Sequence, residues 1–223
     1  MLPGGLIVRH GSTGANSVES SASRKWRGLQ KGIMDLTLTL VAAPFWVPVL
    51  FLLGLMVKLH DKGPVFYRRR VVGPEGQFDA FKLRTMRVDA DRVLDLNPQL
   101  RAEFIKDFKL KEDPRVTRLG KYLRKWSLDE LPQLLNVLKQ QMSLVGPRMI
   151  TREELDKYGP YRDLFLSVKP GLTGYWQVSG RQEVSYEERV KMDVYYIQNW
   201  SLWYDCKILC LTVWKVLKRE GAY

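Results

Sequence analysis

The stretch LTLTLVAAPFWVPVLFLLGLMV, residues 36–57, decides the fold, because its 22 residues contain no charged side chain. A helix that crosses a bilayer needs about 20 consecutive apolar residues, so this segment is long enough to enter a membrane. Pro44 and Pro48 lie inside it. A proline in a helix interior removes a backbone hydrogen bond and bends or breaks the helix. The sequence therefore predicts a membrane helix with a break near Ala43 and Pro44.

Basic side chains flank this segment on both sides. Arg24, Lys25, Arg27 and Lys31 precede it, and Lys58, Lys62, Arg68, Arg69 and Arg70 follow it. Because the cytoplasmic flanks of membrane segments are enriched in lysine and arginine, we expect both ends on the cytoplasmic face. A re-entrant helix over residues 25–60, which enters the membrane, bends and returns, satisfies this charge pattern. A kinked helix that crosses the bilayer is the alternative.

The remaining sequence is expected to form one cytoplasmic domain. Residues 1–24 are rich in glycine, serine and threonine and are interpreted as a flexible leader, not a secretory signal, because they lack an apolar core beside a cleavage site. Residues 61–223 follow the membrane segment and begin with two strands and a turn over residues 65–86. Residues 202–217 are apolar nearly all round and rich in tryptophan, so they form either an interfacial helix or an ordinary buried one. The predicted fold class is α+β, mostly helical, with a re-entrant membrane helix-break-helix, interfacial amphipathic helices and a small β-hairpin.

Composition narrows the chemistry. The 223 residues carry 36 lysines and arginines against 24 aspartates and glutamates, a formal net charge of +12. Such an excess is typical of proteins that bind nucleic acid, anionic lipid or phosphorylated substrates. The chain has only two histidines, so histidine-based catalysis is not expected. Cys206 and Cys210 lie four residues apart in an apolar pattern and are interpreted as small core residues in a reducing compartment.

The chemistry is expected at residues 126–138, WSLDELPQLLNVL. Ser127 followed three residues later by Glu130 is a capping-box pattern, and Pro132 is tolerated in a first helical turn. We therefore predict a helix that begins here, with Asp129 and Glu130 in its first turn. The positive end of the helix dipole favours ionised carboxylates and bound phosphate at that position. The plainer alternative is that both acids only cap the helix.

Basic residues accompany this acidic pair in the sequence. Alternation along the second strand places Lys82 and Arg84 on one face, from which both are able to reach one anion. Glycine- and proline-rich turns or nearby segments bring further arginines: Arg115, Arg118, Arg124, Arg148 and Arg181. Two carboxylates among so many cations suit a metal-bridged phosphate. Hard oxygen ligands favour Mg²⁺, which usually takes one or two protein carboxylates plus phosphate oxygens.

Six sequence blocks together resemble a known family. The blocks are GPVF at 63–66, FKLRTM at 81–86, DPRVTRLG at 113–120, SLDELPQL at 127–134, MSLVGPR at 142–148 and PGLTG at 170–174. They are similar to the bacterial sugar transferases, the monotopic phosphoglycosyl transferases that begin glycan assembly on a polyprenol phosphate. The resemblance extends over residues 31–218. The chain departs from the family at Met149, where a proline usually follows the Gly-Pro-Arg turn.

The resemblance implies a two-step reaction. Asp129 would attack the β-phosphate of a UDP-sugar, release UMP and hold the sugar phosphate covalently until undecaprenyl phosphate takes it over. Glu130 would complete the catalytic pair, and both carboxylates are candidates for holding Mg²⁺. Family positions with phosphate-handling or structural roles match Lys82, Arg124, Arg148, Arg181 and Asp193, and the family's helix break matches Ala43 and Pro44.

The same resemblance implies a place for this reaction. The expected location is the cytoplasmic face of a bacterial inner membrane, at the first membrane step of exopolysaccharide or lipopolysaccharide synthesis. We expect UDP-glucose or UDP-galactose as the donor, membrane lipid around the helix and no nucleic-acid partner, and self-association is left open. On the residues alone, two other functions stay open. One is a membrane-tethered protein that binds anionic lipid or nucleic acid, and the other is a metal-dependent lipid phosphatase.

Overall fold

The computed structural model describes residues 21–107, 110, 113–179 and 184–218. Of the expected leader, residues 1–20 lie outside the described residues, and the first helix begins at Ser21. The described chain is mostly helical with a small antiparallel hairpin, which confirms the α+β class. Arg181 also lies outside the described residues.

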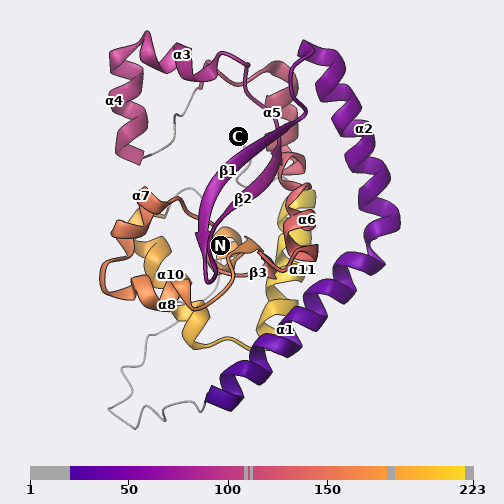
Figure 1. Ribbon diagram of the computed structural model, residues 1–223, viewed down its shortest axis with the longest axis vertical. Coiled ribbons are helices and arrows are strands. Elements are labelled where there is room, and N and C mark those ends of the chain that lie inside the picture. The colour runs from indigo at the N-terminus through magenta and orange to yellow at the C-terminus, as the bar shows by residue number, and fades with distance from the viewer. Residues whose placement is uncertain (1–20, 108–109, 111–112, 180–183, 219–223) are drawn as a thin grey trace, which may run out of the picture.

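The apolar segment forms two helices that meet at a bend (Figure 1). Helix α1 spans Ser21–Val41 and α2 spans Ala43–Asp61. At the junction, the N–H of Ala42 donates to the carbonyl of Leu38. Pro44 occupies the first turn of α2, where a missing N–H costs no helical hydrogen bond. The predicted break at Ala43 and Pro44 is therefore confirmed, and Pro48 is accommodated inside α2.

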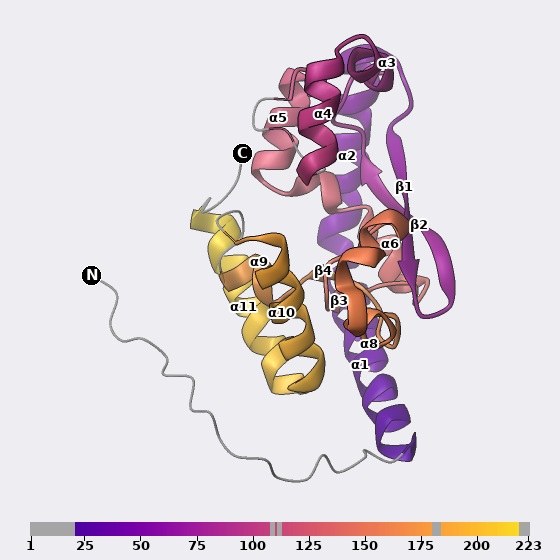
Figure 2. The same ribbon diagram turned by 90° about the vertical axis from the view of Figure 1, so that its left-hand side faces the viewer.

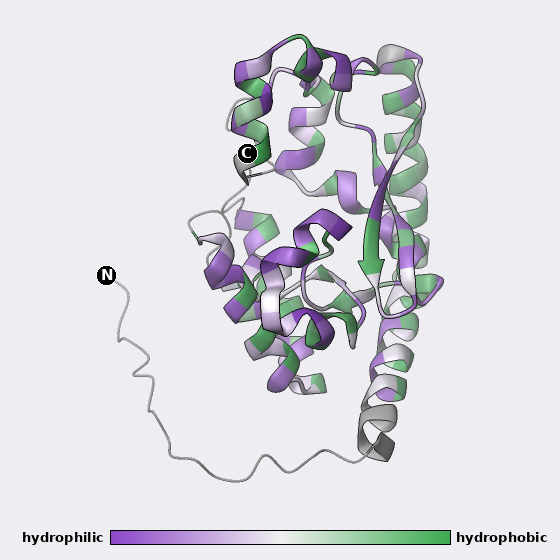
Figure 3. Ribbon diagram, turned by 60° about the vertical axis from the view of Figure 1, so that its left-hand side comes forward, coloured by the Kyte–Doolittle hydropathy of each residue, from purple (hydrophilic) through white to green (hydrophobic). Residues whose placement is uncertain are grey.

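Helix α2 carries an apolar face that the protein does not cover. Among the described residues, one helix is long and apolar enough to cross a membrane, over Ala43–His60, and 17% of that stretch is buried inside the protein. Trp46, Leu53 and Val57 pack against the domain. The exposed apolar side chains of α2 include Phe45, Val47, Phe51, Leu52, Leu55, Met56 and Leu59. In Figure 3 much of the ribbon of α2 has the green of hydrophobic residues. An exposed apolar face of this size indicates an apolar partner.

The predicted strands and turn form a regular hairpin. Strand β1, Phe66–Gly73, pairs with β2, Gly76–Leu83, in an antiparallel register that runs from Phe66 opposite Leu83 to Gly73 opposite Gly76. The hairpin runs from the end of α2 back across the domain (Figure 1). Lys82 lies opposite Tyr67, at the end of the hairpin nearest α2.

Short helices make up most of the remaining domain. Two surface helices, α3, Ala90–Asp95, and α4, Pro98–Asp107, are separated by a break at Asn97. They are followed by α5, Arg118–Lys125, a 3-10 turn at Leu128–Glu130, α6, Gln133–Leu138, α7, Arg152–Leu155, a second 3-10 segment at Asp156–Tyr161, and α8, Arg162–Leu166. The last three helices are α9, Tyr175–Ser179, α10, Tyr186–Gln198, and α11, Leu202–Lys218, which lie together in Figure 2.

A second, parallel pair of strands was not predicted. Strand β3, Ser143–Val145, pairs with β4, Gly171–Thr173, and so joins two glycine-rich segments that were expected to be turns. A Cβ on Gly171 would lie 2.1 Å from the backbone nitrogen of Gly146, so only glycine permits this approach. Met149, the residue that departs from the family pattern, is buried in the adjacent hydrophobic core.

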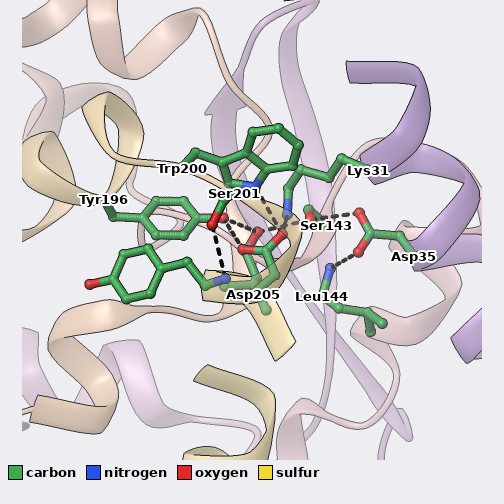
Figure 4. A network of polar contacts seen from close by, with 10 residues as sticks. Lys31, Asp35, Ser143, Leu144, Tyr196, Trp200, Ser201 and Asp205 are labelled. Atoms are coloured by element: carbon green, nitrogen blue, oxygen red, sulfur yellow. Dashed lines mark hydrogen bonds and ion pairs between the residues drawn. The ribbon is translucent and has the colours of Figure 1, made fainter. Parts of the chain in front are cut away.

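A buried polar network ties α1 to the domain (Figure 4). Lys31 Nζ lies 2.5 Å from Oδ2 of Asp205, which also accepts hydrogen bonds from the Tyr196 hydroxyl and the Trp200 indole. One turn along α1, the carboxylate of Asp35 accepts hydrogen bonds from the Ser143 hydroxyl at 2.6 Å and from a β3 backbone N–H. Helix α1 is therefore anchored to the domain through two buried carboxylates.

The structure of α11 differs from the prediction for its cysteines and decides between the two predictions for its apolar face. Cys206 and Cys210 are exposed free cysteines, so their interpretation as core residues is wrong. The reason is that α11 turns Asp205 and Ile208 inwards instead, because Asp205 completes the buried network. Trp203, Val213, Trp214 and Leu217 are exposed, which is incompatible with an ordinary buried helix at these positions.

Candidate active site

Asp129 and Glu130 lie in a 3-10 turn and not in the first turn of a capped α-helix. Ser127 adopts a left-handed conformation with φ 54° and makes no side-chain capping bond, so the predicted capping box is wrong. Helix α6 begins only at Gln133. The carboxylate of Glu130 points elsewhere, because its Oε1 lies 2.6 Å from Nζ of Lys82 on β2. The acidic pair thus faces the hairpin.

Asn136 holds the hairpin against the helix that follows the acidic pair. It is fully buried in α6, and its Oδ1 accepts a hydrogen bond from the Phe81 N–H at 3.0 Å. Its Nδ2 donates to the carbonyl of Asp79 at 2.8 Å and to the side chain of Gln141 at 2.9 Å. One amide therefore satisfies an N–H and a C=O of β2 on either side of Ala80, and so sets the position of Lys82 relative to Glu130.

The two adjacent carboxylates have opposite pKa shifts. Asp129 is 8% exposed, and burial raises its pKa against the opposing effect of the Lys82 ammonium. Glu130 is also desolvated by burial, but the cations of Lys82 and Arg148 outweigh that effect and hold its pKa below the usual range. Asp129 is therefore a poorly solvated carboxylate beside an ionised neighbour. A carboxylate without a hydration shell is well suited to nucleophilic attack.

Two of the expected cations, Arg124 and Arg148, join Lys82 around this pair, and Arg84 lines the same cavity. Arg124 donates from Nε to the Thr85 hydroxyl at 2.9 Å and lines the same cavity. The Arg148 guanidinium stacks over the Trp176 ring at 5.3 Å. Arg84 follows β2, lines the cavity, and packs so closely on Gly63 that a Cβ there would clash with its guanidinium.

The three remaining arginines predicted for the site are not seen facing the acidic pair. Arg115 also lines the cavity, but its guanidinium is engaged with the carboxylate of Asp113 at 2.7 and 2.8 Å and lies 4.8 Å from the Phe104 ring centroid. Arg118 begins α5, is exposed and lies outside the cavity lining. The prediction for Arg181 falls on a residue outside the described part of the chain.

Asp193 is a buried carboxylate that lies beside the turn carrying Arg148. It lies on α10, is 1% exposed, and accepts a hydrogen bond from the Tyr158 hydroxyl at 2.8 Å. The backbone N–H of Arg148 also donates to its carboxylate. Burial raises the pKa of Asp193 to about 7. Asp193 therefore fixes the backbone that presents the Arg148 side chain.

One large cavity of about 1820 Å³ is lined by the acidic pair and by Lys82, Arg84, Arg115, Arg124, Arg148 and Asp193. Its wall carries more basic than acidic side chains and receives residues from β1 to β4, from α3 to α5, from α7 and from α9 to α11. Sequence reasoning missed Trp176, Tyr186 and Arg189 in this wall, because nothing in their local pattern distinguishes them from core or surface residues. It also assigned little chemistry to α3 and α4, whose Leu94 and Phe104 line the cavity.

The acidic pair has the donor set that Mg²⁺ prefers. No group of three or more histidine, cysteine or acidic side chains gathers to hold a metal ion among residues the structure describes. Asp129 and Glu130 nevertheless present two hard oxygen donors in a wall rich in phosphate-binding cations. This set fits a Mg²⁺ ion that completes its coordination with water and substrate phosphate oxygens.

Comparison with known proteins assigns this geometry to a family. The family model for bacterial sugar transferases matches residues 26–219. The chain belongs to the bacterial sugar transferase family. A UDP-galactose-lipid carrier transferase of Erwinia amylovora is 47% identical over 86% of this chain and 41% of its own length. An undecaprenyl-phosphate galactose phosphotransferase of Salmonella typhimurium is 43% identical, over 92% of this chain and 44% of its own length.

A shorter relative matches along most of both chains. The exopolysaccharide production protein ExoY of Sinorhizobium fredii is 43% identical over 92% of this chain and 93% of its own length. The chain therefore spans less than half of the two longer bacterial sugar transferases and nearly the whole of the shorter one. In the present chain, the sequence blocks that resemble the family include the end of β2, the acidic turn and the β3–β4 pair.

Proposed function

We propose that this bacterial sugar transferase is a phosphoglycosyl transferase that moves a hexose-1-phosphate from a UDP-sugar to undecaprenyl phosphate. The observation that carries the proposal is the buried Asp129 beside the Lys82–Glu130 ion pair, in a basic cavity attached to an apolar helix. A soluble nucleotide and a lipid phosphate can both reach such a site. Two relatives are named for galactose or UDP-galactose transfer to a lipid carrier, which supports UDP-galactose, with UDP-glucose as the second candidate donor.

In the first step, a carboxylate oxygen of Asp129 attacks the β-phosphorus of the UDP-sugar. The bond between that phosphorus and the bridging oxygen breaks, and its electron pair leaves with UMP. Phosphoryl transfer depends mainly on positioning and on neutralising charge, which Lys82, Arg124 and Arg148 supply around the acidic pair. The product is an aspartyl-phosphosugar, a mixed anhydride of the kind that carboxylate nucleophiles form.

In the second step, an oxygen of undecaprenyl phosphate attacks the same phosphorus. The bond to the Asp129 oxygen breaks, the carboxylate is regenerated, and polyprenyl-diphospho-sugar is released. Asp129 and Glu130 would hold Mg²⁺, which when bound supplies further neutralisation of the phosphate charges. The lipid chain stays in the bilayer throughout, because the cavity belongs to a domain anchored on α1 and α2.

The membrane arrangement in this proposal is re-entrant, with the domain on the cytoplasmic face of the inner membrane. The bend at Ala42, the uncovered apolar face of α2 and the basic residues on both flanks support it. Tags placed at the two ends of the chain should both be protected from protease in intact cells and both be cleaved in inverted vesicles. Accessibility of the two tags from opposite sides would replace the re-entrant helix by a spanning one.

The covalent step is tested by mass spectrometry. Purified protein incubated with UDP-galactose or UDP-glucose and Mg²⁺, without acceptor, should gain the mass of one sugar phosphate on the peptide that contains Asp129. Asp129→Asn should abolish the adduct and the release of UMP. Turnover by Asp129→Asn at the unaltered rate would refute the nucleophile assignment, and a panel of UDP-sugars in the same assay identifies the donor.

A further inference from the structure

Two arginines from distant segments share one indole ring on the α9–α10 side of the cavity. The guanidinium carbon of Arg148, after β3, lies 5.3 Å from the Trp176 ring centroid, and that of Arg189, on α10, lies 4.8 Å from it. Nε of Arg189 also donates to the carbonyl of Val184 at 3.1 Å. Trp176 is buried on α9. Stacking on a rigid ring pre-orients a guanidinium, whose planar fork matches the oxygens of a phosphate.

Arg148 makes no direct ion pair in this wall among the described residues, although its charge acts on Glu130. Within the described ranges its guanidinium forms no ion pair, whereas Arg69 in the same wall pairs with Glu154 at 2.8 Å. The nearby carboxylate of Asp193 accepts a hydrogen bond from the Tyr158 hydroxyl on Oδ2, its Oδ1 has no hydrogen-bond partner among the described residues, and no ion pair joins it to the Arg148 guanidinium there. A cation held over a buried ring without a carboxylate partner favours a bound anion.

The hydroxyl of Tyr186 is a second, independent sign of a ligand. Its oxygen is buried and has no hydrogen-bond partner among the described residues. The ring is fixed by an edge contact with Tyr158 at 6.4 Å between centroids and by Lys157 Nζ at 4.6 Å. A buried hydroxyl without an acceptor is costly, so a ligand oxygen is the natural acceptor. Tyr186, Arg148 and Arg189 all line the cavity that holds Asp129.

We propose that Arg189, Trp176 and Tyr186 form, together with Arg148, a phosphate-monoester subsite beside the Asp129–Glu130 pair. This inference rests on the proposed function and assigns to that site the phosphate of UMP. The subsite binds the leaving phosphate of the first step, with the two arginines on its oxygens and the Tyr186 hydroxyl donating to it.

The same subsite serves the lipid phosphate in the second step. In phosphoryl transfer the attacking and leaving oxygens lie roughly in line on opposite sides of the phosphorus. In the first step Asp129 attacks and UMP leaves on the far side. In the second step Asp129 is the leaving group, so the lipid phosphate must attack from the side that UMP vacated. One subsite therefore receives both phosphate monoesters in turn.

The test measures binding in the Asp129→Asn protein, which cannot turn over. Isothermal titration with UMP, with uridine, and with farnesyl phosphate against farnesol separates recognition of the phosphate from recognition of base or lipid. Arg189→Gln should weaken both UMP and farnesyl phosphate by about tenfold, the effect of losing one charge-assisted hydrogen bond. Tyr186→Phe should weaken both by a smaller factor, and uridine and farnesol should bind as before. Arg189→Lys, which keeps the charge but not the planar fork, should be intermediate.

Lys191→Gln is the matched control, because Lys191 lies on the same helix, is exposed and is outside the cavity lining. Its affinity for UMP should be unchanged. Far-UV circular dichroism and the unfolding temperature show whether each variant is folded. If Arg189→Gln does not fold, the affinities of Tyr186→Phe for UMP and farnesyl phosphate still test the subsite.

Several results would overturn the subsite. Unchanged affinity for UMP in folded Arg189→Gln and Tyr186→Phe, or an equal loss for UMP and uridine, excludes phosphate recognition here. Weakened UMP with unchanged farnesyl phosphate excludes the shared use by the lipid. Adduct formation by protein with an intact Asp129 distinguishes these failures from failure of the proposed function, because the adduct can form whether or not the subsite is assigned correctly.

Discussion

Nζ of Lys82 lies 2.6 Å from Oε1 of Glu130, and this ion pair joins the second strand of the hairpin to the turn that carries Asp129. It separates the roles of two carboxylates that are neighbours in the sequence. Glu130 is held ionised by direct contact with a cation, while burial raises the pKa of Asp129. The pair also connects α2 to the acidic turn, because the hairpin follows directly after α2.

Lys82→Met should lower both stability and activity. It leaves the Glu130 carboxylate partly buried without its cation, so the free energy of unfolding should fall by about 1–3 kcal/mol. The rate of adduct formation should fall about 100-fold, because a charge aimed at the reacting phosphate is lost. Arg70→Met is the control on the same hairpin, since its exposed pair with Asp79 should contribute less than about 1 kcal/mol. Equal effects of the two substitutions would contradict this assignment.

Asn136→Ala tests the link between α6 and the hairpin. It leaves the N–H of Phe81 and the carbonyl of Asp79 without their side-chain partner, which should cost about 2–4 kcal/mol of unfolding free energy. The rate of adduct formation should also fall, because Lys82 is then less firmly held against Glu130. Urea unfolding and the adduct assay measure the two effects separately. Unaltered stability would show that water replaces both hydrogen bonds.

The elements with strong local signals could be predicted from the sequence. The break at Pro44, the hairpin around Gly73 and Gly76, and the helix that carries Asp193 all follow from proline, glycine or capping patterns. Ser185 and Glu188 form the capping box that starts that helix. Ser127 and Glu130 have the same spacing and form none, because Glu130 has a stronger partner in Lys82. A local pattern cannot reveal such a distant competitor.

The rest depends on contacts between distant segments. Strands β3 and β4 have three residues each, too few to show alternation, and become strands only because Gly146 and Gly171 can approach. The burial of Asp205 follows from its partner Lys31, and so does the outward turn of both cysteines. The sequence correctly indicated that Asp129 is surrounded by cations, but the aromatic wall with Trp176 required three-dimensional contacts.

Lys31→Met should detach α1 from the domain. It leaves the fully buried carboxylate of Asp205 without a cation, although the Tyr196 and Trp200 hydrogen bonds remain. Removal of one partner of a buried ion pair typically costs about 3–5 kcal/mol. Thermal unfolding in detergent should therefore begin at a lower temperature. Lys58→Met removes an equal charge from an exposed position on α2 and should leave the transition where it was. Coincident unfolding curves for the two variants would show that Lys31 is not an anchor.

Asp193→Asn should change how stability depends on pH. The folded-state pKa of Asp193 is raised to about 7, whereas an aspartate in the unfolded chain titrates near a pKa of about 3.9. Below about pH 4 both states bind the proton, and the stability contribution of the neutral, buried carboxyl is fully present. As the pH rises from about 4 to 7, the unfolded state ionises first, so folding becomes less favourable. Above about pH 7 the folded carboxyl is ionised as well, and the loss is complete.

The unfolding free energy of the unaltered protein should therefore fall, relative to that of Asp193→Asn, by up to about 4 kcal/mol between pH 4 and pH 8. Urea unfolding of both proteins across this range measures the difference between their unfolding free energies. The contributions of other titrating groups cancel in this difference, because both proteins contain them. Asp163→Asn, at an exposed position on α8, should give a flat difference over the same range. A flat difference for Asp193→Asn as well would mean that its carboxyl is ionised throughout, and that Arg148 and Tyr158 bind a buried anion.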